Sequence, residues 1–239
     1  MNLYLIALLT GVFTMLGGLF AMRFRDKLHI ISGFSAGAVV GVAFFDLIPE
    51  AIESGAHHFE PSVMMAIVAA GFAAYMVLDR FVFFHGHGDC EHGHNHAAAH
   101  FGAGTLSIHS FMDGLGIGLA YQVSPTLGQI VMLAVIAHDY SDGINTVNLV
   151  MKNGGSKQQA LRWLAVDAAA PIIGITVTTF IKVDMDSLAV ILALFGGFFL
   201  YIGASDLIPE SHHSHPVRWT SLATVLGMAF IYGVIKIMG

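Results

Sequence analysis

The chain has 239 residues, of which 56% are hydrophobic and only 11% are charged. Because a soluble domain carries about 25% charged residues, this composition excludes an ordinary soluble globular protein. The formal net charge is −6, and no cluster of Lys and Arg is available to bind phosphates, which argues against nucleic acid as a partner. We therefore expect a protein that is integral to the lipid bilayer.

Apolar runs of about 20 residues, the length that crosses a bilayer as a helix, recur along the whole chain. They cover residues 3–22, 30–50, 62–84, 102–122, 128–150, 160–181, 188–210 and 218–238. Polar or turn-forming segments separate these runs, and only the segment 85–101 is long. The sequence thus predicts an all-α membrane protein with eight transmembrane helices.

Basic residues near the ends of the runs predict their orientation, because Lys and Arg are retained on the cytoplasmic side. The loops after the first, third, fifth and seventh runs, together with the adjacent helix ends, hold Arg23, Arg25, Lys27, Arg80, Lys152, Lys157, Arg162 and Arg218. The opposite side has only Lys182 and Lys236. We expect both termini to be extracytoplasmic and the protein to reside in the cell (inner) membrane.

The motif Asp-Leu-Ile-Pro-Glu occurs twice, at residues 46–50 and 206–210, and Gly37 and Gly197 share the same offset. Five steps along the series of runs separate the two copies, so the copies run in opposite directions, as in an inverted repeat. The predicted organisation is 3+2+3. It comprises a first three-helix repeat (1–84), a His-rich cytoplasmic loop (85–101), a central helix pair (102–150) and a second, inverted three-helix repeat (160–239).

Polar residues at the ends of the second and seventh runs are expected to line vestibules on the two sides of the membrane. They are Asp46, Glu50, Asp206, Glu210, His212 and His213. The long loop is rich in imidazole, a composition typical of weak metal chelation, and it is expected to collect or sense metal. Its candidate ligands are His85, His87, His92, His94 and His96.

The central helix pair carries His and Asp residues near its middle, with the spacing of one helix face. His109 and Asp113 are four residues apart, and so are His138 and Asp142. An ionised Asp at the bilayer centre costs about 2.5 to 3.5 kcal/mol on insertion scales. From residue 81 to residue 151 the sequence has no Lys or Arg that could neutralise these carboxylates. A divalent cation such as Zn²⁺, Fe²⁺ or Mn²⁺ suits mixed imidazole and carboxylate ligands.

Three further polar residues accompany these pairs: Ser110, Asp139 and, in the next run, Asp167. They are candidate additional ligands. A plainer interpretation is that the polar groups of the central helices hydrogen-bond to one another and stabilise a helix bundle.

Two motifs in the central pair resemble the ZIP (Zrt/Irt-like) family of divalent metal transporters. Where that family has His-Asn-x-Pro-Glu-Gly, residues 109–114 read His-Ser-Phe-Met-Asp-Gly. Where it has Gln/His-acid-x-x-Glu-Gly, residues 138–143 read His-Asp-Tyr-Ser-Asp-Gly. The chain departs from the family in three ways. Ser110 replaces the family's Asn, and Asp113 and Asp142 are each one methylene shorter than its Glu residues. At Ala170 the family tends to place a Glu before the proline.

This resemblance implies inward transport of a divalent metal, Zn²⁺ or a related ion such as Fe²⁺, Mn²⁺, Co²⁺ or Cd²⁺. It implies a first metal position at His109, Asp113, His138 and Asp142, and a second, bridged position that would use Ser110, Asp139 and Asp167. It also implies that spans one, four, five and six move as a unit against the other four, commonly within a homodimer. No organic cofactor is expected, and no G-x-x-x-x-G-K-[ST] motif for ATP is present.

Two other functions also fit a buried His/Asp site. A cation diffusion facilitator would export the metal, although that family usually has six spans and a soluble C-terminal domain. An intramembrane zinc hydrolase would use the metal to activate water, but the sequence has no His-Glu-x-x-His motif.

Overall fold

The computed structural model describes residues 2–22, 29–84, 96–209 and 217–238. Its described residues form helices and connecting turns, without strands. The helices are α1 (Leu3–Ala21), α2 (His29–Val42), η1 (Ala43–Leu47), α3 (Ile48–Gly55), α4 (Pro61–Phe84), α5 (His96–Val123), α6 (Pro125–Lys152), α7 (Lys157–Thr178), α8 (Met185–Tyr201), η2 (Ile202–Leu207) and α10 (Val217–Met238). The all-helical class predicted from the sequence is confirmed.

Within the described part of the chain, six helical segments are long and apolar enough to cross a membrane. They are Leu3–Ala21, Gly33–Gly55, Pro61–Leu78, Lys157–Thr178, Met185–Ser205 and Trp219–Met238. The set leaves out α5 and α6, although each is 28 residues long. These two helices carry the buried His and Asp side chains, so their polarity reflects the site rather than exposure to water.

Among the described residues, helices α1, α6, α7 and α8 begin at a residue whose side chain caps a free backbone N–H group of the first turn. Ser124 caps α6, where Pro125 follows at a position that needs no N–H donor. Ser156 caps α7 and forms a capping box with Gln159. Asp184 caps α8, and the Ser187 backbone N–H lowers the pKa of this exposed carboxyl.

Two helix boundaries differ from those expected. The helix α5 begins at His96, so the end of the predicted 85–101 loop is helical, as the strong helix formers Ala97 to Ala99 favour. The second predicted span continues beyond residue 50, through α3 to Gly55.

Each copy of the Asp-Leu-Ile-Pro-Glu motif begins in a π-helical turn, and after the first copy the helix continues to Gly55. The Ile48 N–H bonds to the Ala43 carbonyl, and the Ile208 N–H bonds to the Gly203 carbonyl, five residues back in both cases. A proline cannot donate to the carbonyl four residues before it, and its ring crowds that carbonyl. The wider turn before each proline accommodates this defect and lets the helix continue.

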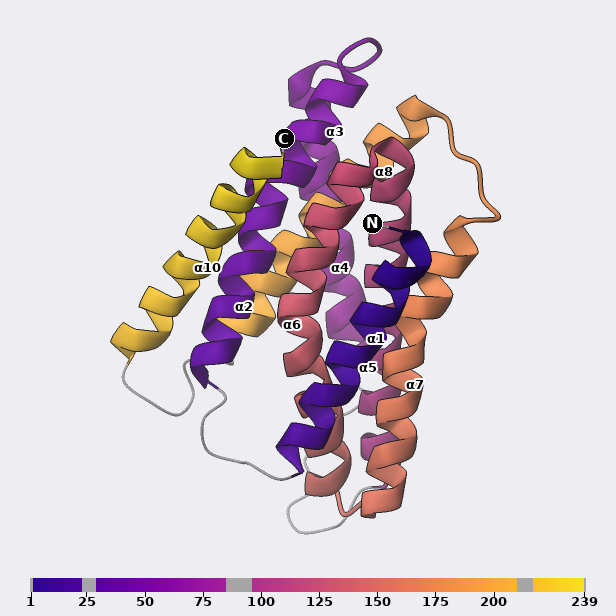
Figure 1. The fold of residues 1–239 in the computed structure, drawn as a ribbon, viewed down its shortest axis with the longest axis vertical. Helices are drawn as coiled ribbons and strands as arrows, with labels where there is room; N and C mark the ends of the chain where they lie inside the picture. The colour runs from indigo at the N-terminus through magenta and orange to yellow at the C-terminus, as the bar shows by residue number, and fades with distance from the viewer. Residues whose placement is uncertain (1, 23–28, 85–95, 210–216, 239) are drawn as a thin grey trace.

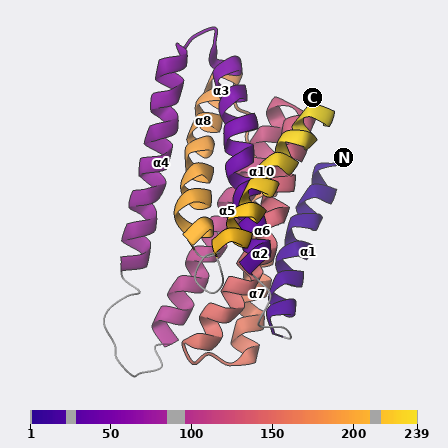
Figure 2. The same ribbon diagram turned by 90° about the vertical axis from the view of Figure 1, so that its left-hand side faces the viewer.

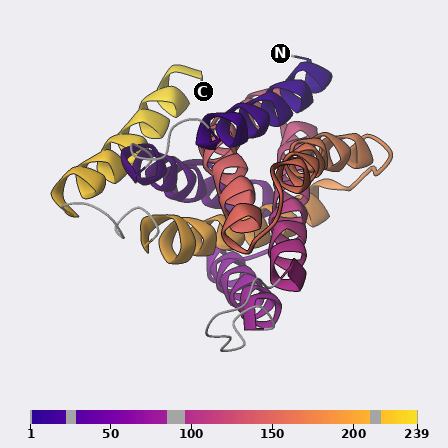
Figure 3. The same ribbon diagram turned by 90° about the horizontal axis from the view of Figure 1, so that it is seen from below.

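The helices pack in two groups (Figures 1 and 3). In the first group α1 packs on α6 and α7, and α5 packs on α6 and α7. In the second group α2 packs on α10, and α8 packs on α4 and α3. The first turn of α1 and the last turn of α10 lie toward the same end of the bundle (Figures 1 and 2).

Glycines allow the closest helix crossings. A Cβ atom at Gly17 would lie 1.9 Å from the Tyr140 carbonyl oxygen, and one at Gly143 would lie 1.9 Å from that of Thr14. At the α5–α7 crossing, Cβ atoms at Gly114 and Gly174 would each lie 2.3 Å from a carbonyl oxygen of the facing helix. These contacts hold the two site-bearing helices against α1 and α7.

Candidate metal centre

The candidate metal centre lies between α5 and α6, two antiparallel neighbours joined at Ser124. Residues four apart on a helix share a face, so each helix directs one His and one Asp toward the other. One ligand atom from each of His109, Asp113, His138 and Asp142 lies within 4.8 Å of the other three. The structure therefore brings together the four residues expected for a first metal position.

Both imidazoles turn Nε2 toward the carboxylates. The Asp113 Oδ2 atom lies 3.3 Å from His109 Nε2 and 3.1 Å from His138 Nε2. The Asp142 Oδ2 atom lies 3.8 Å from each of the same two nitrogens. Two nitrogens and two oxygens thus converge, a ligand set suited to Zn²⁺ and other borderline divalent ions.

The ring of His138 is held so that Nε2 faces the carboxylate of Asp113. Its Nδ1 lies 2.9 Å from the Ala134 carbonyl oxygen, which can only accept a hydrogen bond. The Nδ1 atom therefore carries the proton, and a neutral ring has its lone pair on Nε2. That lone pair faces Asp113 at 3.1 Å, an arrangement that needs a proton or a cation between the two atoms.

The ring of His109 is held by a side chain from another helix. Its Nδ1 lies 2.7 Å from the hydroxyl of Tyr75, on α4. The side chain of His109 is 11% exposed, whereas those of the other three residues are between 1% and 5% exposed. His109 is thus the most accessible of the four residues.

Of the three candidate additional ligands, Asp167 and Ser110 bond to each other. The Ser110 hydroxyl donates to Asp167 Oδ1 over 2.7 Å, and the Thr146 hydroxyl donates to Asp167 Oδ2 over 2.7 Å. Asp167 is fully buried and ties α7 to α5 and α6. It lies outside the four-residue cluster.

Two carboxylates, one beside the cluster and one within it, keep buried oxygens without a hydrogen-bond partner among the described residues. They are both oxygens of Asp139 and Oδ2 of Asp142. A buried anion without a partner is strongly destabilising, so these oxygens call for a compensating positive charge.

The vestibule candidates lie apart from the cluster or outside the described residues. Asp46 is in η1 and half-buried, and Glu50 accepts a 2.8 Å hydrogen bond from Ser54. For Asp206 only the backbone, in η2, is described. Glu210, His212, His213 and the loop residues His85, His87, His92 and His94 lie outside the described residues, and His96 begins α5.

Sequence reasoning missed Tyr75 and Thr146. Thr146 follows His138 and Asp142 at the next four-residue step of the same helix face, which is a usable signal. Tyr75 has no such signal, because its contact with His109 joins residues that are 34 positions apart.

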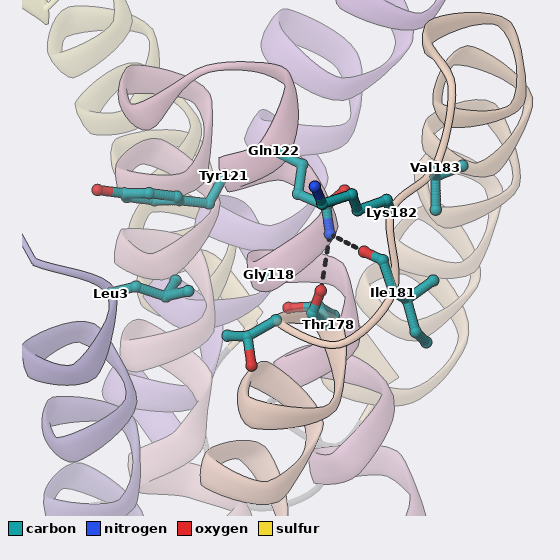
Figure 4. A pocket seen from close by; sticks show the side chains of 9 residues that line it. Leu3, Gly118, Tyr121, Gln122, Thr178, Ile181, Lys182 and Val183 are labelled. Atoms are coloured by element: carbon teal, nitrogen blue, oxygen red, sulfur yellow. Dashed lines mark hydrogen bonds between the residues drawn. The ribbon is translucent and has the colours of Figure 1, made fainter.

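A separate pocket of about 390 Å³ lies at the C-terminal ends of α5 and α7 (Figure 4). Gln122 Nε2 donates to the carbonyl oxygens of Thr178 and Ile181, both over 2.9 Å. These bonds tie α5 to the end of α7 and to the segment that follows it. None of the four cluster residues lines this pocket.

Apolar helices of spanning length around a buried His/Asp cluster define a membrane protein with a candidate metal site. The sequence profile of the ZIP zinc transporters matches residues 103–238, from α5 to the end of α10. The chain belongs to this family, as its central motifs predicted. The family consists of transporters, not enzymes, which sets aside the zinc hydrolase.

Individual relatives agree with the family match. The chain is 28% identical to Zinc transporter zipt-7.1 of Caenorhabditis briggsae over 137 residues, which are 55% of this chain and 35% of the relative. It is 29% identical to Metal cation symporter ZIP8 of Rattus norvegicus over 104 residues, 44% of this chain and 22% of the relative. It is 32% identical to Zinc transporter ZIP4 of Homo sapiens over 103 residues, 43% of this chain and 16% of the relative. The matches therefore span about a third or less of these relatives' lengths.

Proposed function

We propose that the chain carries divalent transition-metal ions, Zn²⁺ foremost, across a membrane into the cytoplasm by alternating access. The ion binds between α5 and α6 through His109, Asp113, His138 and Asp142. The observation that carries this proposal is the convergence of these four residues within 4.8 Å in a part of the bundle without any Lys or Arg. The names of the relatives, which include zinc transporters and a metal cation symporter, support the same class of cargo.

The proposed topology has eight spans, with α5 and α6 added to the six apolar ones. In a membrane the polar faces of α5 and α6 meet each other and α7, so neither helix exposes its Asp residues to lipid. Both termini are proposed to be extracytoplasmic, in the cell (inner) membrane. The excess of Lys and Arg on the other side supports this orientation.

We further propose that spans one to three and six to eight form an inverted repeat around the central pair. Matched packing supports it: α1 crosses α6 at paired glycines, and α7 crosses α5 in the same way. The matching π turns at residues 43–47 and 202–207 also support it.

Transport requires the site to open alternately to each side. The two packing groups suit this motion, with α1, α5, α6 and α7 as a mobile unit and the remaining helices as its support. An inside-negative potential favours inward movement of a divalent ion by about 4.6 kcal/mol per 100 mV, twice the value for one charge.

A second ion beside the first would use Asp139, Ser110 and Asp167. The unpartnered oxygens of Asp139 favour such a position. Asp167 would have to exchange a hydroxyl partner for the ion. We also propose that the acids of the two repeated motifs line the vestibules. The His-rich segment is proposed to collect metal, and the proposed assembly is a homodimer.

Export of the metal, which the sequence also allowed, is the alternative direction, since the geometry of the site does not depend on direction; membership of the ZIP family sets aside the cation diffusion facilitator itself. Purified protein in liposomes with a metal-sensitive dye inside tests the proposal. We expect His138→Ala and Asp142→Ala to abolish Zn²⁺ flux, because each removes a ligand from a four-ligand site. His58→Ala and Asp186→Ala, which change an exposed His–Asp pair 2.9 Å apart, serve as matched controls and should transport normally. Flux near the native level in both site variants would overturn the proposal.

A further inference from the structure

We infer that Tyr75 is a positioning residue that holds His109 in the metal site and thereby favours ions that prefer imidazole. This inference rests on the proposed function, because it assigns a role in the same metal site. It starts from a difference between the two imidazoles. His138 is held by a carbonyl of its own helix, whereas His109 is held by a hydroxyl from α4.

The position of the Tyr75 hydroxyl is itself constrained. The Tyr75 ring packs against two rings of α8, with centroid distances of 5.4 Å to Phe198 and 5.6 Å to Tyr201. It meets the His109 ring edge to face, at 6.2 Å and 77°. Because the aromatic contacts restrict the tyrosine ring, its hydroxyl stays 2.7 Å from His109 Nδ1.

This hydrogen bond acts on the coordinating nitrogen through the ring. A neutral imidazole that binds a metal through Nε2 carries its proton on Nδ1, and that N–H then donates to the Tyr75 oxygen. Such outer hydrogen bonds orient a ligating His, and their loss typically lowers metal affinity about 10- to 100-fold. Without the hydroxyl, the partly exposed His109 side chain is free to turn Nε2 away from the site.

The choice of metal follows from the ligands that remain. With His109 in place the site offers two nitrogens and two carboxylates. When His109 turns away, one nitrogen and two carboxylates remain, a set richer in oxygen. Imidazole favours Zn²⁺, whereas carboxylate and water suit Mn²⁺. Loss of the hydroxyl should therefore weaken Zn²⁺ binding much more than Mn²⁺ binding.

The experiment measures Kd for Zn²⁺ alone and for Mn²⁺ alone, using the purified full chain in detergent and a competing chelator dye. Tyr75→Phe keeps the ring and removes only the hydroxyl. We expect its Zn²⁺ Kd to rise about tenfold, within the range for outer partners of a ligating His, and its Mn²⁺ Kd to rise less than about threefold. Tyr232→Phe makes the same change on α10, where the ring packs against Phe45 and Lys236, and should alter neither constant.

A double-mutant cycle tests whether Tyr75 acts through His109. His109→Ala should lower the preference for Zn²⁺ over Mn²⁺ in the same direction, and Tyr75→Phe should add no further loss in that background. Equal weakening of both ions in Tyr75→Phe, or additive losses in the double variant, would overturn the inference. So would an unchanged preference in His109→Ala, whatever Tyr75→Phe does.

The outcome for the site as a whole is read separately in His138→Ala. If that variant still binds Zn²⁺ like the native chain, the proposed function fails. If it loses Zn²⁺ while Tyr75→Phe binds both ions normally, only the role of Tyr75 fails.

Discussion

At the scale of single residues, the buried carboxylates decide how this chain behaves with and without metal. Asp113 and Asp142 face two imidazoles, while Asp139 keeps both oxygens without a hydrogen-bond partner among the residues described. Removing one partner of a buried ion pair leaves an uncompensated charge, which costs far more than a surface pair contributes. A divalent cation bound in the proposed site would compensate these charges.

Zinc should stabilise the native chain, and a chelator should destabilise it. A ligand that binds only the folded state at 100 times its Kd adds about 2.7 kcal/mol. In Asp142→Asn, which keeps the shape and loses the charge, we expect the zinc-induced rise in Tm to disappear. We also expect the metal-free variant to melt above the metal-free native chain, because a buried anion whose Oδ2 has no hydrogen-bond partner among the described residues becomes neutral. Thermal unfolding in detergent with Zn²⁺ or a chelator measures both, and a full zinc-induced shift in the variant would contradict this assignment.

At the scale of helices, glycines set how closely the site-bearing pair approaches its neighbours. Gly143 faces the Thr14 carbonyl with no room for a methyl group, and Gly17 faces the Tyr140 carbonyl in the same way. Overpacking a tight interface forces the backbones apart, typically at 1 to 3 kcal/mol. Since Asp142 precedes Gly143, such a shift would move a proposed ligand.

We expect Gly143→Ala to lower stability by about 2 kcal/mol and to weaken Zn²⁺ binding, because the α1–α6 crossing must widen. Gly233→Ala is the matched control on α10, where an added Cβ would meet nothing within 4 Å. The control should gain up to about 1 kcal/mol from better helix propensity. Thermal unfolding and zinc titration of both variants provide the test. Equal stability of the two variants would show that the α1–α6 crossing accommodates a methyl group without widening.

At the scale of the whole molecule, the proposed inverted repeat explains why similar π turns and similar glycine crossings each occur at two places. The π turns before Pro49 and Pro209, and the glycine crossings α1–α6 and α7–α5, lie in corresponding parts of the two proposed repeats. Copies of opposite orientation give the central pair a similar support on each side. Such symmetry suits a site that opens first to one face and then to the other.

The orientation can be tested with single cysteines in a Cys90→Ser background. Gln158 is exposed in the first turn of α7, and Glu60 is exposed in the connection before α4. We expect a membrane-impermeant maleimide applied outside intact cells to label Glu60→Cys and not Gln158→Cys, because Lys152, Lys157 and Arg162 retain the latter segment inside. Permeabilised cells provide the control, in which both variants should react. The reverse pattern would invert the topology and favour the exporter.

The sequence by itself determined the helical class, the family and the two His–Asp pairs, because hydrophobic length and four-residue spacing are local properties of a helix. It also placed the four residues on facing helices, through the short connection at Ser124. It placed the Asp-Leu-Ile-Pro-Glu motifs at the ends of the second and seventh spans, whereas the structure shows a π turn at each and continues the first of these helices to Gly55.

Only the tertiary structure decided which partners meet across helices. Asp167, a candidate ligand from spacing alone, accepts hydrogen bonds from Ser110 and Thr146, while His109 turns to Tyr75. Such contacts depend on the rotation and depth at which whole helices pack, which the glycine crossings and the core set together. No spacing along one helix carries that information.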